Sequence, residues 1–335
     1  MDTPWVGDAG RQQCRGEPAI ENPPGAGPLG TGNPERFSGE PPVLGPPTVD
    51  VSIVAPVHNE SRILPEFVAR CTRALEQIDL SFELLLVDDA SRDDTPARLA
   101  DLTRDPRVRA CRLPSNVGQF RATQAGLREA RGRWVAVLDG DLQDPPECLP
   151  TLVAVLSAAA PAIVAVLAVK TRRDDPWAFM VGQFVFHRLQ HAFSRVPVPR
   201  GAGSYCVMRG PLAARVAMAG LRRANLAAVV AVAAHAVGGE LATVPYEKGP
   251  RYDRRARVGW RGLAAEAVGS LAVTGALPRL LVGVAFVLGV CGYMVDGYPV
   301  ARSLLFGAAA AVAALSLWVN RYRRCGLAAM LAPVG

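Results

Sequence analysis

The chain has 335 residues, half of them hydrophobic, with a formal net charge of +7 and a pI of about 9.3. A chain of this length can form one large domain or two smaller ones, with an ample hydrophobic core in either case. The seven cysteines are dispersed without a C-x-x-C pair, which argues against a disulfide framework or a zinc site and for a reducing compartment. The positive charge indicates an anionic partner. Because the arginines are scattered rather than interleaved with aromatic residues, we expect membrane lipid and no nucleic acid.

Residues 1–48 are crowded with proline and glycine and show no hydrophobic period. This composition predicts a disordered tail. The first twenty residues contain no apolar stretch, so no signal peptide is expected.

Strand and helix patterns alternate after this tail. The predicted strands are 51–57, 82–87, 108–113 and 134–138. Helices are expected from the early sixties to about Gln77, from Thr95 as N-cap with Pro96 behind it, and from Asn116 and Gly118 towards Gly132. This alternation predicts an α/β domain over residues 49–250 with a mainly parallel, doubly wound sheet.

Polar side chains follow three of these strands: Asn59 with Glu60, Asp88 with Asp89, and Asp139 with Asp141. The carboxyl ends of parallel strands meet at one edge of a sheet, so we expect a single acidic crevice there. The sequence lacks a G-x-G-x-x-G or P-loop motif whose amides would cradle phosphates. A metal ion is expected in their place, which favours a nucleotide-sugar site over a dinucleotide oxidoreductase.

The segment 134–147 carries the strongest signal. A buried strand runs into Asp139, Asp141 and Gln143, whose oxygens suit Mg²⁺ or Mn²⁺. Asp144, ahead of two prolines, predicts the N-cap of a helix. A surface turn is the alternative for a bare Asp-x-Asp, but the strand before it and the helix start after it favour the metal site.

The string Leu138-Asp-Gly-Asp-Leu-Gln-Asp-Pro-Pro-Glu147 resembles the signature of family 2 glycosyltransferases of GT-A fold, in the branch that acts on polyprenyl phosphates. The resemblance covers roughly residues 50–325. It implies a metal-dependent, inverting sugar transfer. Residues in roles implied by the resemblance are, for the donor, Pro56, His58, Glu60, Asp88, Asp89, Asn116, Gly118 and Asp139; for the metal, Asp141 and Gln143; and for catalysis, Asp139 and Asp141.

Two positions depart from the family pattern. His58 stands where relatives commonly have an aromatic residue, and Ser204 stands where they carry an Asp that serves as base on the acceptor side. A phosphate monoester has a second pKa of about 6, so it is mostly dianionic at pH 7 and needs little deprotonation. Loss of the Asp therefore leans towards a phosphate acceptor rather than a hydroxyl.

The acceptor phosphate is expected to meet arginines. Arg172 and Arg173 follow a predicted strand over 162–169, and Arg251 lies in a basic segment. Guanidinium groups match phosphate oxygens bidentately, and relatives place an Arg-rich acceptor loop near 172–173. A solvated basic loop is the alternative for both segments.

The C-terminal part predicts membrane attachment. Residues 251–277 read as a basic and amphipathic interface segment, and 278–324 as two transmembrane helices with apolar runs 280–295 and 304–319, followed by a cytoplasmic tail at 325–335. Arginines flank the runs at Arg279, Arg321, Arg323 and Arg324. The positive-inside rule then predicts a multi-pass protein of the cell membrane whose catalytic domain is cytoplasmic. A buried helical hairpin is the alternative.

These observations predict an enzyme of the cell envelope that transfers a sugar from a nucleotide sugar to a polyprenyl phosphate. Two alternatives stay open: a GT-A transferase with a hydroxyl acceptor, and a catalytically silent membrane scaffold. Relatives also imply a possible homo-oligomer.

Overall fold

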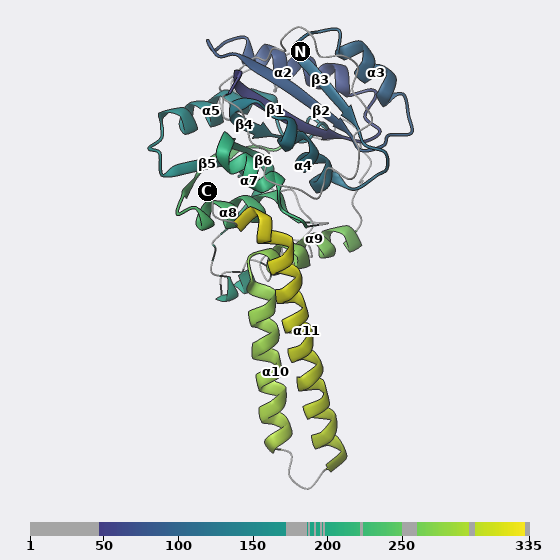
Figure 1. Cartoon of the computed structure of the whole chain (residues 1–335), viewed down its shortest axis with the longest axis vertical. Coiled ribbons are helices and arrows are strands. Elements are labelled where there is room, and N and C mark those ends of the chain that lie inside the picture. Colours follow the sequence, from purple (N-terminus) through teal and green to yellow (C-terminus); the bar gives the residue numbers. More distant parts are fainter. Residues whose placement is uncertain are drawn as a thin grey trace.

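The computed structural model describes residues 47–171, 186, 188–190, 192–194, 196, 198–221, 224–249, 260–294 and 299–331. An α/β domain carries a long helical hairpin that projects from one side (Figure 1). The predicted N-terminal tail, apart from its last two residues, and the proposed acceptor residues Arg172, Arg173 and Arg251 lie outside the described residues.

One seven-stranded sheet forms the centre of the domain, in the order β3-β2-β1-β4-β6-β5-β7. The strands are β1 Val49–Val57, β2 Phe82–Asp88, β3 Val108–Arg112, β4 Gly132–Val137, β5 Ile163–Lys170, β6 Ala202–Arg209 and β7 Glu240–Tyr246. The strands β1 to β4 are parallel to one another, as are β5 and β7, whereas β6 runs antiparallel to both of its neighbours. The mainly parallel α/β sheet predicted from the sequence is confirmed.

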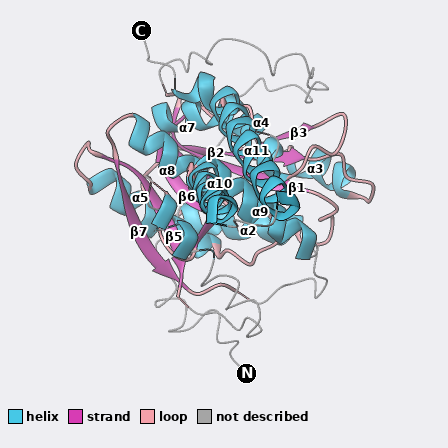
Figure 2. Cartoon of the chain, turned by 90° about the horizontal axis from the view of Figure 1, so that it is seen from below, coloured by secondary structure: helices cyan, strands magenta, loops and turns pink. Residues whose placement is uncertain are grey.

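Helices cover both faces of this sheet (Figure 2). They are α2 Leu64–Leu75, α3 Thr95–Leu102, α4 Gln119–Glu129, the 3₁₀ helix η2 Pro146–Cys148, α5 Leu149–Ala158, α7 Gly210–Ala217 and α8 Leu226–Ala236. Residues of α2, α3 and α5 share one buried cluster with one face of the strands, and residues of α4, α7 and α8 share a second cluster with the other face. Two cores thus hold the sheet between them, which is the arrangement that alternating strands and helices produce.

Two helix starts differ from the expectation. Thr95 is the first residue of α3 rather than its cap, and its hydroxyl instead accepts the backbone N–H of Glu60 at 2.8 Å. Asp144 does not cap a helix, because η2 begins at Pro146. The carboxylate of Asp144 instead accepts a hydrogen bond from the hydroxyl of Tyr246. Both side chains contact partners that are distant in sequence, which local patterns do not reveal.

The hairpin consists of α10 Ala276–Met294 and α11 Pro299–Leu331, and α9 Trp260–Val273 leads into it through a bend of 89° next to Gly275. By length and composition, one described helix, Ser303–Ala328, is apolar enough to cross a membrane, and the bent pair Ala267–Val273 with Ala276–Cys291 passes the same test together. Only 11% of the Ser303–Ala328 window is buried, and Phe286 and Leu317 are each 72% exposed. These exposures fit a surface that faces lipid rather than a soluble core.

Helix α11 extends beyond the apolar run that was predicted to end at 319. Leu327 and Met330 are fully buried in the cluster formed by α7 and α8, and the carbonyl of Gly326 accepts the backbone N–H of Gly220 at 2.6 Å. Residues 325–331, which we expected to begin a cytoplasmic tail, therefore continue the helix and fasten the hairpin to the α/β domain.

Candidate functional site

Three loops meet at one edge of the sheet, because β2, β1 and β4 are adjacent and parallel. Each loop contains a non-glycine residue in the left-handed region: Asn59 with φ 55°, Ala90 with φ 55° and Leu142 with φ 58°. No other described non-glycine residue has a positive φ. Such conformations cost roughly 1 kcal/mol or more each and cluster at functional sites, where surrounding contacts hold them in place.

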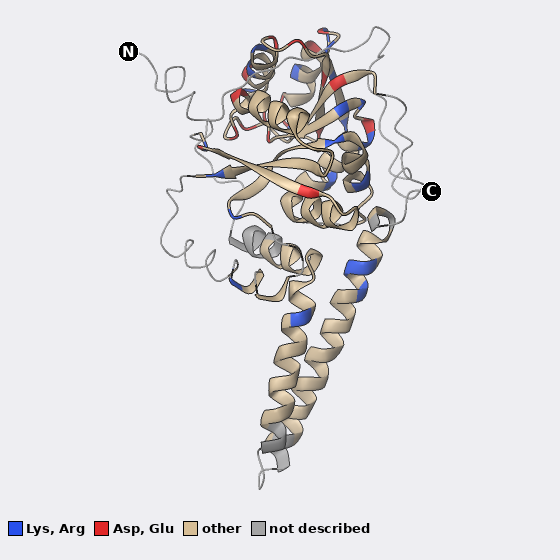
Figure 3. Cartoon of the chain, turned by 90° about the vertical axis from the view of Figure 1, so that its left-hand side faces the viewer, with Lys and Arg blue, Asp and Glu red and all other residues tan. Residues whose placement is uncertain are grey.

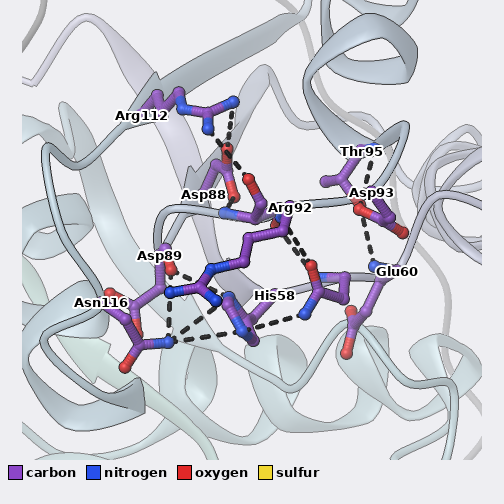
Figure 4. A network of polar contacts seen from close by, with 11 residues as sticks. His58, Glu60, Asp88, Asp89, Arg92, Asp93, Thr95, Arg112 and Asn116 are labelled. Atoms are coloured by element: carbon purple, nitrogen blue, oxygen red, sulfur yellow. Dashed lines mark hydrogen bonds and ion pairs between the residues drawn. The ribbon is translucent and has the colours of Figure 1, made fainter.

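The loops after β1 and β2 are joined through His58 (Figure 4). The imidazole Nδ1 lies 2.8 Å from the carbonyl oxygen of Asp89 and must donate to it, while the side-chain amide of Asn59 lies 3.0 Å from Nε2. The amide of Asn116 is 3.4 Å from the same Asp89 carbonyl, so the side chains of His58 and Asn116 meet at this oxygen.

The Asp pair after β2 is engaged with the protein itself. Both carboxylate oxygens of Asp89 accept backbone N–H groups, from Val117 at 2.7 Å and from Gly118 at 2.8 Å. Gly118 has φ +89°, a conformation that favours glycine, and it precedes α4. Asp88 is fully buried, accepts the N–H of Ser91 at 2.8 Å and lies 3.5 Å from Arg112. These carboxylates hold the loops that follow β2 and β3 in place, and their predicted contact with the donor stays a prediction.

Glu60 connects the first loop to the Asp139-Gly-Asp141 turn. Its side chain is buried, and a Cβ added at Gly140 would lie 2.6 Å from its Oε2 and 3.0 Å from Cγ1 of Val57. No side chain fits at position 140 without displacing Glu60. The glycine between the two aspartates thus serves the close approach of two loops.

The carboxylates of the turn crowd together. Oδ1 of Asp139 accepts the side-chain amide of Gln119 at 2.6 Å, and Ser204 also hydrogen-bonds to Asp139. Burial, followed by the charges of Asp144 and Asp141, raises the pKa of Asp139 to about 7, against the lowering effects of Lys248 and of the Ser204 hydrogen bond. Mutual repulsion of this kind is what a bound cation relieves.

The far side of the turn rests on β6 and β7. The hydroxyl of Tyr246 donates to Asp144, and that of Tyr205 donates to the carbonyl of Pro145 at 2.9 Å, with the two rings edge to face at 5.5 Å. The N–H of Gly249 donates to the carbonyl of Gln143 at 2.8 Å. Burial raises the pKa of both tyrosines, so they remain hydrogen-bond donors. This support came from two strands that the sequence patterns had not predicted.

The predicted metal ligands lie next to each other but form a sparse set. Oδ1 of Asp141 accepts the backbone N–H of Gln143 at 3.1 Å, and both side chains are half-buried. The described part of the chain holds no group of three or more His, Cys, Asp or Glu side chains arranged to hold a metal ion. An ion at Asp141 and Gln143 would therefore take most of its ligands from water and substrate oxygens, as Mg²⁺ commonly does.

The structure thus brings the predicted residues after β1, β2 and β4 to one edge and supplies neighbours that the sequence had not indicated. The side-chain amide of Gln119 donates to Asp139, and the hydroxyl of Thr95 accepts the backbone N–H of Glu60. Lys248 lies beside Asp144, with its Nζ 4.0 Å from Oδ1. For Gln119, the one local signal of a role in the site was its place as a polar residue directly after the Asn116-Val-Gly118 turn.

Residues 52–215 match the model of glycosyl transferase family 2. Among curated proteins, undecaprenyl-phosphate 4-deoxy-4-formamido-L-arabinose transferases are similar: that of Sodalis glossinidius is 44% identical over 129 residues, 38% of this chain and 39% of the relative. That of Pseudomonas syringae pv. syringae is 42% identical over 130 residues, 38% of each chain. The match thus spans about two fifths of the length of these relatives.

Similar solved structures include a mannosyltransferase from Pyrobaculum calidifontis in complex with GDP-Man and Mn²⁺, with a TM-score of 0.45, 20% identity, and coverage of 90% of this chain and 81% of that one. Glucosyl-3-phosphoglycerate synthase from Mycobacterium tuberculosis with Mn²⁺, UDP-Glc and phosphoglyceric acid has a TM-score of 0.47, 19% identity, and coverage of 67% and 78%.

Proposed function

We propose that this chain, whose residues 52–215 match the model of glycosyl transferase family 2, transfers a sugar from a nucleotide-sugar donor to the phosphate of a polyprenyl phosphate. The observation that carries the proposal is the Asp139-Gly-Asp141 turn, held by Glu60, Gln119 and Ser204 at the edge where three strands end. The names of the curated relatives, which are undecaprenyl-phosphate transferases, support the choice of acceptor.

The donor would lie across the loops after β1 and β2. His58 and Asn116 would contact the base, on a wall made rigid by the bonds of Asp89 to the backbone of Val117 and Gly118. Pro56, Glu60 and Asp88 would shape the same pocket from below, because all three are buried in or directly after their strands. Asp139 would approach the ribose and diphosphate.

Asp141 and Gln143 would hold Mg²⁺ or Mn²⁺. A divalent ion fits this position because it relieves the repulsion from Asp144 and Asp141 that, after burial, raises the pKa of Asp139. When bound, the ion neutralises the charge that develops on the leaving diphosphate.

In the transfer step, an oxygen of the acceptor phosphate forms a bond to the anomeric carbon while the bond from that carbon to the diphosphate oxygen breaks, and the electron pair leaves with the nucleoside diphosphate. The configuration inverts because the attack comes from the face opposite the leaving group. The residues of the site align the two substrates, an effect of proximity and orientation. Arg172, Arg173 and Arg251 remain the acceptor residues that the sequence proposes.

The hairpin would place this site at the cytoplasmic face of the cell membrane. The basic residues that Figure 3 colours on the hairpin gather near its junction with the α/β domain. In the sequence, Arg279 precedes the first apolar run and Arg321, Arg323 and Arg324 follow the second, whereas Arg302 and one acidic residue, Asp296, stand between the runs. Two spans with their basic ends on the side of the domain satisfy the positive-inside rule.

The test is transfer itself. Purified protein in detergent, given undecaprenyl phosphate, Mg²⁺ and a panel of radiolabelled nucleotide sugars, should move label into an organic-extractable product that mild acid hydrolyses, as expected of a glycosyl phosphate. Asp141→Ala should abolish transfer and weaken Mn²⁺ binding measured by electron paramagnetic resonance. Asp101→Ala, an exposed position on α3, is the matched control.

The two alternatives give different results in the same assay. An acid-stable labelled product would favour a hydroxyl acceptor, and no turnover of any nucleotide sugar by the wild type would favour the scaffold.

A further inference from the structure

Two arginines from the two helices of the hairpin meet at the bend between α9 and α10. Gly275 lies in this bend with φ +75°. A Cβ added to it would lie 3.4 Å from Cζ of Arg323 and 3.5 Å from Nη2 of Arg279. Arg279 belongs to the first turn of α10, and Arg323 lies towards the end of α11. Two guanidinium groups from different helices therefore lie against the same glycine.

Each of these guanidinium groups is oriented by a backbone carbonyl. Nε of Arg323 donates to the carbonyl of Val273, the last residue of α9, at 2.7 Å. Nη1 of Arg279 donates to the carbonyl of Phe193. Basic side chains commonly bind the last carbonyls of a helix in this way. These bonds explain why both groups point to the bend, but a neutral carbonyl does not balance the charge of Arg323.

The charges that act on Arg323 are of one sign. They belong to Arg279 and Arg324, and among the residues that the structure describes no acidic side chain forms an ion pair with Arg323. The side chain of Arg323 is half-buried. A partly buried cation next to other cations is costly unless an anion neutralises it. The bend therefore suits an anion.

The depth of the arginines along the hairpin indicates where this anion comes from. Trp318 and Tyr322 stack on α11 with ring centroids 6.0 Å apart, and both are exposed. Arg323 follows Tyr322 directly. Because Trp and Tyr of membrane helices lie at the level of the lipid head groups, the two guanidinium groups lie at the level of the lipid phosphates.

An apolar track leads away from the arginines along α10. Arg279, Val282 and Phe286 are spaced by three and then four residues, so they share one face of the helix. Both apolar side chains are exposed. A lipid whose phosphate is bound at the bend can therefore lay an acyl chain along this face.

We propose that Arg279 and Arg323 together bind the phosphodiester of an anionic membrane phospholipid such as phosphatidylglycerol, with one acyl chain along Val282 and Phe286. Guanidinium forks match phosphate oxygens bidentately. Phosphatidylcholine has the same phosphodiester, but its choline cation would meet the two arginines, so a head group with net negative charge is favoured. The bound lipid joins α9, α10 and α11 at the bend. This assignment rests on the membrane placement in the proposed function and not on sugar transfer.

Native mass spectrometry of the full-length protein in detergent tests the site, because it counts bound lipids one by one. The wild type should bind the first phosphatidylglycerol more tightly than the first phosphatidylcholine. Affinity for the first phosphatidylglycerol should fall at least about fivefold in Arg279→Gln and in Arg323→Gln. Arg321→Gln, which removes an exposed cation from the same turn of α11, is the matched control and should keep most of the affinity.

Several results would overturn this site. The two lipids are compared on the wild type without any substitution, so equal affinity for both decides against it even where a variant fails to fold. Equal losses in all three variants would indicate a diffuse attraction to the leaflet. Displacement of the bound phosphatidylglycerol by undecaprenyl phosphate would assign the arginines to the acceptor, and displacement by glycerol 3-phosphate would show an anion site that needs no lipid.

Failure of this site and failure of the proposed function can be told apart. A protein that transfers sugar to a polyprenyl phosphate but does not prefer phosphatidylglycerol would overturn the lipid site alone. A protein that prefers phosphatidylglycerol, loses this preference in Arg279→Gln and Arg323→Gln, and transfers no sugar would overturn the proposed transfer and support the lipid site.

Discussion

Replacement of Asp139 by Asn should stabilise the metal-free protein near neutral pH while it abolishes transfer. The pKa of Asp139 is raised from 3.8 to about 7 by burial and by the charges of Asp144 and Asp141. Each pKa unit corresponds to about 1.4 kcal/mol, so ionising this carboxyl in the folded protein costs up to about 4 kcal/mol. Asn keeps the shape and removes that cost.

The sign of the pH dependence follows from the raised pKa. Below pH 3.8 Asp139 is protonated in both the folded and the unfolded protein, and its full contribution to stability is present. As the pH rises towards 7, the unfolded chain ionises first, and this contribution is progressively lost. The wild type without metal should therefore melt at a lower temperature at pH 7.5 than at pH 5.5, and the difference should be smaller in Asp139→Asn.

The assay is thermal unfolding in detergent with EDTA, at both pH values, followed by circular dichroism. At pH 7.5 the variant should melt several degrees above the wild type, since about 1 kcal/mol shifts the midpoint by roughly 2–4 °C in a chain of 150–250 residues. Added Mg²⁺ should stabilise the wild type more than the variant. Equal melting temperatures of the two proteins at pH 7.5 in EDTA would refute the reasoning about crowded carboxylates.

Three further substitutions test how the site is held. Gly140→Ala should weaken Mn²⁺ binding and lower the melting temperature by the equivalent of about 1–3 kcal/mol, because its Cβ would meet Glu60 at 2.6 Å. A double-mutant cycle of Arg70→Ala and Glu147→Ala should give a coupling above about 1 kcal/mol in unfolding experiments, because the guanidinium of Arg70 binds both oxygens of Glu147 in a partly buried pair. Leu327→Ala should cost about 2–5 kcal/mol of stability, since this side chain at the end of α11 is fully buried in the α/β domain.

Matched controls exist for two of these. The pair Arg73–Glu66 lies on the same helix as Arg70 but is 64% and 49% exposed, so its coupling should be close to zero. Leu317→Ala, at a position 72% exposed on α11, should leave the folding of the α/β domain unchanged. A loss from Leu317→Ala as large as that from Leu327→Ala, or an equal coupling in both ion pairs, would contradict the packing described above.

The sequence indicated the central site because its signals are local. The strand patterns before Glu60, Asp89 and Asp139 are short apolar runs that end in polar residues, and parallel strands need no further information to bring their ends to one edge. The ten-residue string Leu138–Glu147 predicted a resemblance to family 2 glycosyltransferases, and residues 52–215 match the model of that family.

Other features could not be derived locally. Asp144 was expected to cap a helix because two prolines follow it, but Tyr246 on β7 binds its carboxylate. The antiparallel strand β6 lies between β4 and β5 and places Ser204 next to Asp139. The hydrophobic pattern of the sequence does not predict which two strands β6 pairs with. Long-range pairing of this kind overrides local propensity.

The sequence by itself therefore determined the type of sheet, the acidic turn and the apolar hairpin, because each follows from the order of residues within a single element. Only the tertiary structure decided that the end of α11 is buried against α7 and α8, that Lys248 lies beside Asp144, and which neighbour each carboxylate contacts. Those outcomes depend on contacts between residues far apart in the chain, and such contacts are fixed when the elements pack together rather than when they form.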